Sequence, residues 1–290
     1  MRAREPDADG FVDRGGVKLH WERFGHGEPT LLLLPTWTVV HARFWKAQIP
    51  YLARHFRVVT YDGPGNGRSD RPLDPGPYGY EEEARAAAAV LDATGTGRAV
   101  AVSVSMGAQW ALWLMANRPE LMVGSVFIGP AIDLGLMDGD VEDTFDEPYT
   151  STEGWARYNR YYWLDHYQDF LEFFFAQCFS EAHSTKQVED AVGWGLETSP
   201  EVLIAEHAGP EPDGATARDW CARSTCPVLV IHGDGDQVVA PRHGRALAEA
   251  TGGTLVVLGG AGHIPNARDP VKVNRLIADF ARSLPATEPR

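Results

Sequence analysis

The chain has 290 residues, with 26 Lys or Arg, 40 Asp or Glu and three Cys, and its formal net charge at pH 7 is −14. Hydrophobic residues make up 44% of it, enough for a sizeable core, which excludes intrinsic disorder, collagen and coiled coil. The negative charge excludes a nucleic-acid partner. The lack of any stretch of about 18 apolar residues excludes a membrane span. The odd number of cysteines predicts no disulfide framework.

Short apolar runs alternate with amphipathic segments along most of the chain. The first run, residues 17–24, alternates polar and apolar residues and predicts an antiparallel strand. Later runs are apolar throughout, as expected for parallel strands covered on both faces, at residues 30–34, 56–61, 98–105, 122–128, 227–232 and 254–258. The segments between them predict helices at residues 44–54, 80–93, 106–118, 242–250 and 271–284. This order predicts a doubly wound, mostly parallel α/β sheet.

The alternation stops after Pro130 and resumes at Cys226. Residues 135–220 contain 19 acidic but only four basic residues, together with 15 aromatic residues, whereas the rest of the chain is close to neutral. Helical patterns at residues 158–179 and 184–196, without a strand pattern, predict an all-helical cap (lid). The expected domains are an α/β core of residues 1–134 and 221–290 and a cap inserted at residues 135–220.

Ser105 lies where a buried strand passes into a helix, in the sequence Ser103-Val104-Ser105-Met106-Gly107. A serine at so sharp a turn has strained backbone angles and needs small residues two positions away, here Ser103 and Gly107. The turn presents the hydroxyl and directs the backbone N–H of Met106 toward the place where an oxyanion would form. Ser105 is therefore the expected nucleophile. Ser103 is the alternative nucleophile, and helix capping is the alternative role for Ser105.

This segment resembles the G-x-S-x-G nucleophile elbow of the α/β-hydrolase superfamily, with Ser103 in the place of the first glycine. The superfamily has the chain order Ser, Asp or Glu, then His, which implies a catalytic triad of Ser105, Asp236 and His263. Asp236 follows the strand at residues 227–232, and His263 lies in a glycine-rich loop after the strand at residues 254–258. Carboxyl ends of parallel strands meet at one edge of the sheet, where open α/β folds build their sites.

Two other residues are candidates for the acid of the triad. Asp234 precedes Asp236 by two residues, and Asp133 follows the preceding strand, where some relatives of this superfamily place the acid. His232 ends a strand, and we expect it to be structural.

Two more segments extend the resemblance. Residues 62–70 resemble the D-x-P-G-x-G-x-S turn, with Asn66 in the place of the usual His. The loop that often contains His-Gly and an aromatic residue is here Pro35-Thr36-Trp37. The resemblance implies an oxyanion hole formed by the backbone N–H groups of Trp37 and Met106.

A serine with His and Asp partners implies an acyl-serine intermediate and makes a carboxylic ester or lactone hydrolase the first hypothesis. The aromatic cap predicts a bulky, largely apolar small-molecule substrate, such as a macrolide-like lactone, bound by Trp37, Trp155 and Phe174. The acidic cap would attract a cationic substrate, or would simply face water. Hydrolysis of a carbon–carbon bond with the same triad and a small-molecule receptor or sensor with little turnover are the alternative functions.

No motif requires a metal ion or an organic cofactor. The expected partner is the small-molecule ester or lactone itself, and the expected assembly is a monomer or a homodimer. The first ten residues carry charges without the apolar stretch of a secretory signal, so the expected location is cytoplasmic.

Overall fold

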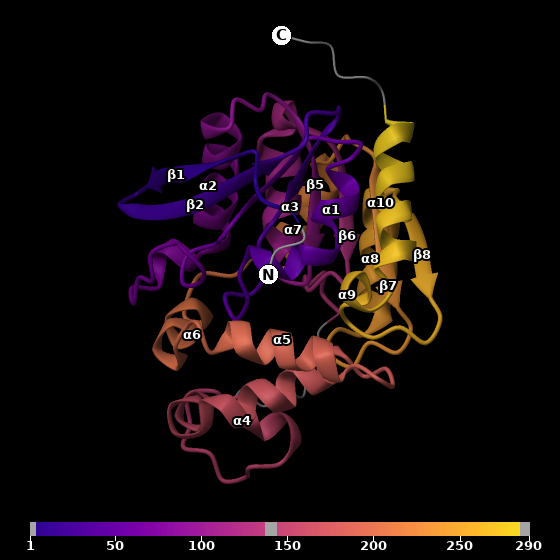
Figure 1. Ribbon diagram of the computed structural model, residues 1–290. Coiled ribbons are helices and arrows are strands. Elements are labelled where there is room, and N and C mark those ends of the chain that lie inside the picture. The colour runs from indigo at the N-terminus through magenta and orange to yellow at the C-terminus, as the bar shows by residue number, and fades with distance from the viewer. Residues whose placement is uncertain (1–3, 137–143, 285–290) are drawn as a thin grey trace.

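The computed structural model describes residues 4–136 and 144–284, which form an eight-stranded sheet covered by helices on both faces (Figure 1). The strands are β1 (Ala8–Arg14), β2 (Val17–Phe24), β3 (Thr30–Leu33), β4 (Val58–Tyr61), β5 (Ala99–Val104), β6 (Met122–Ile128), β7 (Val228–Gly233) and β8 (Thr254–Leu258). Their order across the sheet is β1-β2-β4-β3-β5-β6-β7-β8. Strands β3 to β8 are parallel, and β2 is antiparallel to both of its neighbours. The predicted α/β-hydrolase fold, with its mostly parallel sheet, is confirmed.

Helices connect the strands and continue beyond one end of the sheet. The α-helices are α1 (Ile49–Leu52), α2 (Tyr80–Ala93), α3 (Gly107–Asn117), α4 (Arg160–Cys178), α5 (Thr185–Gly195), α6 (Pro200–His207), α7 (Gly214–Arg223), α8 (Pro241–Thr251), α9 (Pro265–Arg268) and α10 (Pro270–Ser283). Short 3-10 helices in the described part of the chain are η1 (Ala42–Ala47), η2 (Gly76–Tyr78), η3 (Pro119–Leu121) and η4 (Gly154–Arg157).

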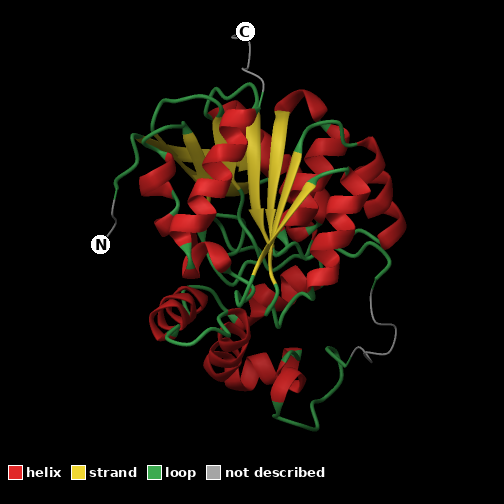
Figure 2. Cartoon of the chain, turned by 90° about the vertical axis from the view of Figure 1, so that its right-hand side faces the viewer, coloured by secondary structure: helices red, strands yellow, loops and turns green. Residues whose placement is uncertain are grey.

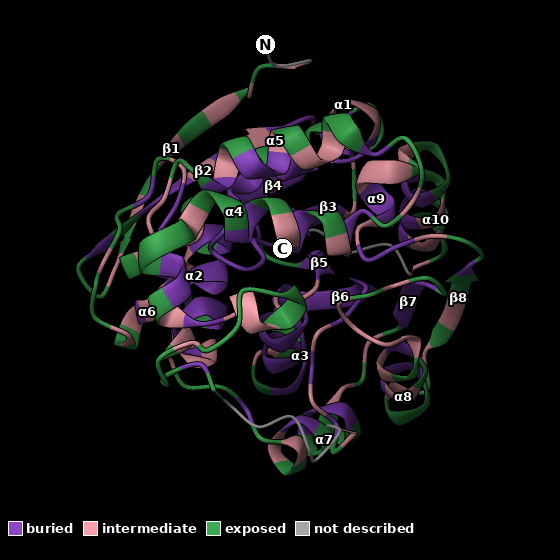
Figure 3. Cartoon of the chain, turned by 90° about the horizontal axis from the view of Figure 1, so that it is seen from below, coloured by how far each residue is buried: buried purple, intermediate pink, exposed green. Residues whose placement is uncertain are grey.

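The core lies on both faces of the sheet, because successive side chains of a strand point to opposite sides. On β3, Leu31 and Leu33 join a cluster with residues of α1 and α10, whereas Leu32 joins a cluster with α2, α3, α7 and α8. Burial on both faces explains the uninterrupted apolar runs in the sequence. The edge strand β8 is only partly buried (Figure 3).

Two elements differ from the sequence prediction. The helix expected at residues 44–54 is instead η1 followed by the short α1, because Pro50 lacks an N–H and restricts the residue before it. Strand β1 was not predicted. Its residues are alternately exposed and half-buried, and it pairs only with β2 at the edge of the sheet, so it has no apolar run.

Helices α4, α5 and α6 lie beyond the carboxyl ends of the parallel strands (Figures 1 and 2). We call these three helices, together with the segments that join them, the cap. Residues 137–143 of the predicted cap lie outside the described residues. Helix α7, at the end of the predicted cap, packs instead on the sheet's helical layer, since Ala217, Trp220 and Cys221 belong to the cluster that contains α3. Among the described residues, no helix is long and apolar enough to cross a membrane.

Candidate active site

Ser105 occupies the sharp turn between β5 and α3, with a φ of 50° that is unusual for a residue other than glycine. Its N–H donates to Ile128 O at 3.0 Å, which holds the strained turn against β6. Gly107 is required because a Cβ there would lie 2.6 Å from Pro35 O. The same Cβ would be 3.4 Å from the Cβ of Ser103, so serine is small enough for the position where the superfamily motif has glycine.

The alternative nucleophile is enclosed in the sheet. Ser103 is fully buried within β5, and its Oγ donates a hydrogen bond to Val126 O at 3.3 Å. This placement gives Ser103 the geometry of a strand residue, while the strained turn belongs to Ser105.

His263 links Ser105 to Asp236. Its Nε2 lies 3.0 Å from Ser105 Oγ, and its Nδ1 lies 2.8 Å from Asp236 Oδ2. A carboxylate at Nδ1 fixes the proton on that nitrogen, which leaves Nε2 free to accept the hydroxyl proton of Ser105. Gly129, with a φ of 51°, makes room for the ring, since a Cβ there would lie 3.2 Å from Nδ1.

The side chain of Asp236 is buried and receives four hydrogen bonds. Its Oδ1 accepts the backbone N–H groups of Val238 and Val239 at 2.8 Å each, and its Oδ2 accepts His263 Nδ1 and, at 3.0 Å, His232 Nε2. Burial acts to raise the pKa of Asp236, but the hydrogen bonds from His232 and His263 outweigh it and hold the pKa well below the usual range. The carboxylate is therefore ionised whenever the protein is folded near neutral pH.

The two other candidate acids bond to backbone groups. Asp234 Oδ1 accepts the N–H of Gly260 at 2.6 Å, and Asp133 Oδ1 accepts the N–H of Gly135 at 2.6 Å. Of the three carboxylates considered, Asp236 is the one that the fold brings to His263.

The cap holds the loop that carries His263. The N–H of His263 donates to Cys178 O at 3.1 Å, at the end of α4, and the N–H of Gly262 donates to Glu181 Oε1 at 2.8 Å. Just before that glutamate, Ser180 Oγ donates to Gly235 O at 3.3 Å, in the turn that carries Asp236. The position of His263 therefore depends on the end of a cap helix, although His263 itself belongs to the body.

We call residues 35–40 the oxyanion loop, after the role that the family resemblance implies for Trp37. Trp37 O accepts the N–H of Val40 at 3.2 Å, and Thr38 O accepts Asn66 Nδ2 at 2.9 Å. The N–H of Thr38 donates to Glu206 Oε1, on the cap helix α6, at 3.3 Å. Body and cap therefore hold this loop together.

Of the three predicted substrate-binding side chains, Phe174 contacts both of the others, Trp37 and Trp155. Trp37 lies within the aromatic residues of the cap, and its ring centroid is 4.8 Å from that of Phe174. Trp155 is 45% exposed, and its ring lies in T-shaped arrangements with Phe173, at a centroid distance of 5.4 Å, and with Phe174, at 6.3 Å.

A cavity of about 130 Å³ lies beside the site, between η1, α4, α5 and α9. Its wall includes Thr36, Val104 and Ile264, which are adjacent in the sequence to Trp37, Ser105 and His263. The walls are mostly apolar and come from Val40, Phe44, Ala47, Phe175, Phe179, Ala191, Trp194 and Ala267. Lys46 and Lys186 also line the cavity, and both pair with Asp190. A cavity of about 150 Å³ accommodates a benzene molecule, which gives the scale of the group that fits.

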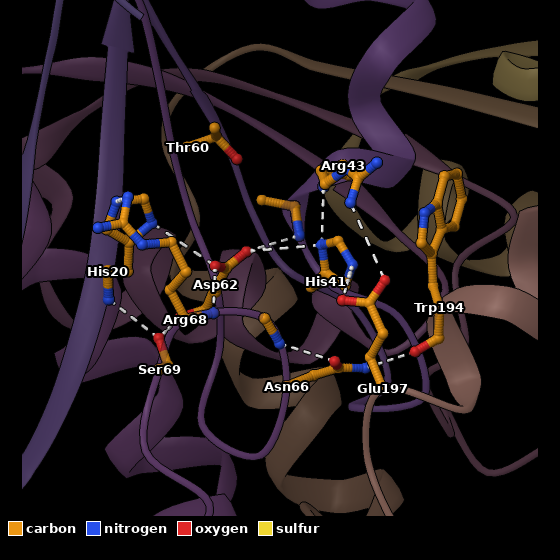
Figure 4. Close-up of polar contacts among 12 residues, drawn as sticks. His20, His41, Arg43, Thr60, Asp62, Asn66, Arg68, Ser69, Trp194 and Glu197 are labelled. Carbon is orange, nitrogen blue, oxygen red and sulfur yellow. Dashed lines mark hydrogen bonds and ion pairs between the residues drawn. The ribbon is translucent and has the colours of Figure 1, made fainter. Parts of the chain in front are cut away.

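A second buried carboxylate lies between two histidines at the end of β4 (Figure 4). His20 Nδ1 is 3.6 Å from Asp62 Oδ2, and His41 Nδ1 is 4.0 Å from Asp62 Oδ1. His41 Nε2 lies 3.3 Å from Glu197 Oε2, in the segment between α5 and α6. This cluster joins the turn at residues 62–70 to the cap.

Sequence reasoning missed the contact residues Glu181 and Glu206. The sequence does single out Glu206, because this acidic residue directly follows the apolar residues Val-Leu-Ile-Ala of α6. Glu181 follows a helix end in an ordinary polar loop, and only the fold reveals its partner.

Comparison with known proteins identifies the family and the fold. A family model described as alpha/beta hydrolase fold matches residues 29–270. The chain is 24% identical over 281 residues to 3-oxoadipate enol-lactonase 2 of Acinetobacter baylyi, covering 90% of this chain and 92% of that protein. A 53-residue alignment, 43% identical, with the pimeloyl-[acyl-carrier protein] methyl ester esterase of Sodalis glossinidius covers 18% of this chain and only 20% of that protein. The bromoperoxidase of Bacillus anthracis shares the fold with a TM-score of 0.80 at 20% identity, covering 95% of this chain and 100% of that one.

Proposed function

We infer that this chain, which belongs to the alpha/beta hydrolase family, hydrolyses a carboxylic ester or lactone through an acyl-serine intermediate. The observation that carries the proposal is the contact of Ser105 Oγ with His263 Nε2 at 3.0 Å, with His263 Nδ1 in turn bonded to Asp236. The names of two relatives, an enol-lactonase and a methyl ester esterase, support the choice of bond.

In the proposed reaction Ser105 Oγ attacks the carbonyl carbon while His263 Nε2 takes its proton. The carbonyl oxygen becomes an oxyanion, for which the backbone N–H groups of Met106 and Trp37 are the proposed donors. The intermediate collapses, His263 returns the proton to the leaving alkoxide, and the acyl group stays on Ser105. Water, deprotonated by His263, then attacks the acyl carbon and releases the acid and free Ser105. Asp236 stays ionised and stabilises the imidazolium in both halves.

The cavity at the site supports a substrate with a compact apolar group. Its volume of about 130 Å³ and apolar walls favour a short acyl or small ring substituent over the bulky macrolide-like lactone that the cap composition suggests. The proposed partner is therefore a small ester or lactone.

A fluorophosphonate probe and a chromogenic short-chain ester test the proposal together. We expect the probe to label wild-type protein at Ser105 and the ester to be turned over, with a burst of alcohol release if deacylation is slow. Ser105→Ala should lose both while circular dichroism and the melting temperature stay close to wild type. A folded wild-type protein that neither reacts with the probe nor hydrolyses esters and lactones would contradict the proposal and favour a receptor.

A further inference from the structure

Glu206 is a buried acidic residue of the cap that contacts the oxyanion loop of the body. It lies near the end of α6, and only 6% of its surface is exposed. Its Oε1 accepts the hydrogen bond from the N–H of Thr38 at 3.3 Å. The cap therefore reaches the residue next to Trp37 through one carboxyl group.

With this hydrogen bond, both polar groups of one peptide unit are held. The unit that joins Trp37 to Thr38 is planar, with the carbonyl oxygen at one side and the Thr38 N–H at the other. Val40 N–H holds the oxygen at 3.2 Å, and Glu206 holds the N–H. Because the plane is fixed on both sides, the backbone N–H of Trp37, which belongs to the preceding peptide unit, can change direction only by rotation about the two backbone bonds of the Trp37 Cα.

The surroundings of Glu206 are unfavourable for a negative charge. Burial raises the pKa of Glu206 to about 8 and outweighs the hydrogen bonds from Thr38 and Trp37, which act to lower it, while the nearby carboxyl of Glu211 acts in the same direction as burial. The other titratable groups that face it are Glu83 of α2, Tyr78 of η2 and Tyr167 of α4. The pKa of Glu83 is itself raised well above its usual range by burial. These groups are carboxyls and phenols, so near pH 7 the neutral form of Glu206 predominates.

We propose that Glu206 is a positioning residue for the oxyanion hole, which holds the peptide unit after Trp37 while it is neutral and lowers the rate when it ionises. This inference rests on the proposed function. Both forms of the carboxyl group accept the Thr38 N–H, but the ionised form adds a negative charge beside the loop on which negative charge develops in the transition state. In a buried site such a charge is poorly screened and opposes the oxyanion.

The test measures kcat and KM of the full chain for a chromogenic short-chain ester between about pH 6.5 and 9.5, a range that brackets carboxyl ionisation near pH 8. Wild-type kcat should fall as the pH rises through about 8. Glu206→Gln keeps an oxygen acceptor and stays neutral, so its kcat should be close to wild type at pH 7 without the alkaline decline. Glu206→Leu removes the acceptor and should lower kcat about tenfold or more at every pH, with a smaller change in KM.

Glu201→Gln is the matched control, because it removes the same charge from the exposed first turn of the same helix. It should keep the wild-type pH profile. A Glu206→Gln profile that declines like the wild type would overturn the proposal, and this variant decides the matter even if Glu206→Leu fails to fold. If wild-type protein shows neither Ser105 labelling nor turnover at any pH, the proposed hydrolase function fails first, and this inference fails with it.

Discussion

Two buried carboxylates, Asp236 and Asp62, have nearly the same setting but different neighbours. Each follows a strand of the sheet, each accepts two backbone N–H groups, and each has two histidines beside it. At Asp236 both histidine nitrogens are within 3.0 Å of Oδ2. At Asp62 the corresponding distances are 3.6 and 4.0 Å.

The decisive difference is what lies beyond the histidine. His263 reaches the hydroxyl of Ser105, whereas His41 reaches Glu197 of the cap. A histidine between two carboxylates has no group to deprotonate, so the Asp62 cluster joins parts of the protein and the Asp236 cluster is suited to move a proton. A buried Asp–His pair is therefore weak evidence of chemistry without a nucleophile on the far nitrogen.

The largest predicted effect is the difference in kcat between substitutions of the two carboxylates. Asp236→Asn places an amide at His263 Nδ1 and favours the wrong tautomer, so kcat should fall about 10⁴-fold. Asp62→Asn should leave kcat within about tenfold of wild type, since its histidines do not touch Ser105. Steady-state assays of both folded variants check this, with Asp133→Asn and Asp234→Asn as controls for the other candidate acids. Equal losses at positions 62 and 236 would mean that the Asp62 cluster contributes to the rate as much as the Asp236 cluster does.

The sequence contained most of what positions the proposed chemistry. The elbow around Ser105 was predictable because a strained turn, a close strand–helix approach and a buried strand each leave a mark on local residues. The strand ends that carry Asp236 and His263 were predictable for the same reason, since uninterrupted apolar runs end there. The body of this fold is encoded locally.

The contacts of the cap were not predictable in that way. Glu181 and Glu206 act through backbone N–H groups of residues far away in the chain, and a backbone donor leaves no trace in the sequence. The acid-rich composition of the cap suggested steering of substrates, yet Asp190 and Glu197 pair with Lys46 and Arg43 of the body. Part of the negative charge thus serves to attach the cap.

His232 is the second histidine that contacts Asp236. Its Nε2 lies 3.0 Å from both Asp236 Oδ2 and Val239 O, and two oxygen acceptors require that this nitrogen carries the proton. A hydrogen bond to a charged group contributes about 1.5–3 kcal/mol, so His232→Phe should lower kcat about tenfold by loosening Asp236.

The matched control for this variant is His20→Phe, at the equivalent position beside Asp62, which should leave kcat unchanged. The same assay compares the two variants, and a separate thermal melt shows that both are folded. A His232→Phe enzyme with wild-type kcat would mean that the backbone N–H groups of Val238 and Val239 suffice to hold Asp236.

Asp62 should affect stability instead of rate. Its Oδ1 accepts the N–H of Ala42 at 3.0 Å and its Oδ2 that of Arg68 at 2.9 Å, so Asp62→Asn leaves one buried donor without an acceptor. The free energy of unfolding should fall by about 1–3 kcal/mol. Urea denaturation at pH 7 measures this loss, and a variant as stable as wild type would show that the turn at residues 62–70 does not depend on the carboxylate.

The pH dependence of the same variant follows from the direction of its shift. Burial acts to raise the pKa of Asp62, but the nearby His20 ring and the hydrogen bond from the Arg68 N–H outweigh it, so the folded-state pKa lies below the unfolded one. The stabilisation is therefore complete above the unfolded pKa and disappears as the pH falls through the folded one. The difference between wild type and Asp62→Asn should narrow in acid.

The smallest predicted effect concerns His41, which joins the Asp62 cluster to the cap. Burial lowers the pKa of His41, although Asp62 and Glu197 act in the opposite direction. The folded protein therefore binds this proton less readily than the unfolded chain, and the free energy of unfolding should decrease as the pH falls below the unfolded pKa of about 6.5. His41→Gln cannot titrate, so between about pH 7 and 5 its stability should fall less steeply than that of wild type. Urea denaturation across this range measures the slopes, and hydrogen exchange in α5 and α6 reports whether the loss begins at the cap. Identical slopes would mean that Asp62 and Glu197 offset the burial of the ring, and His41 would then join body and cap equally well in either protonation state.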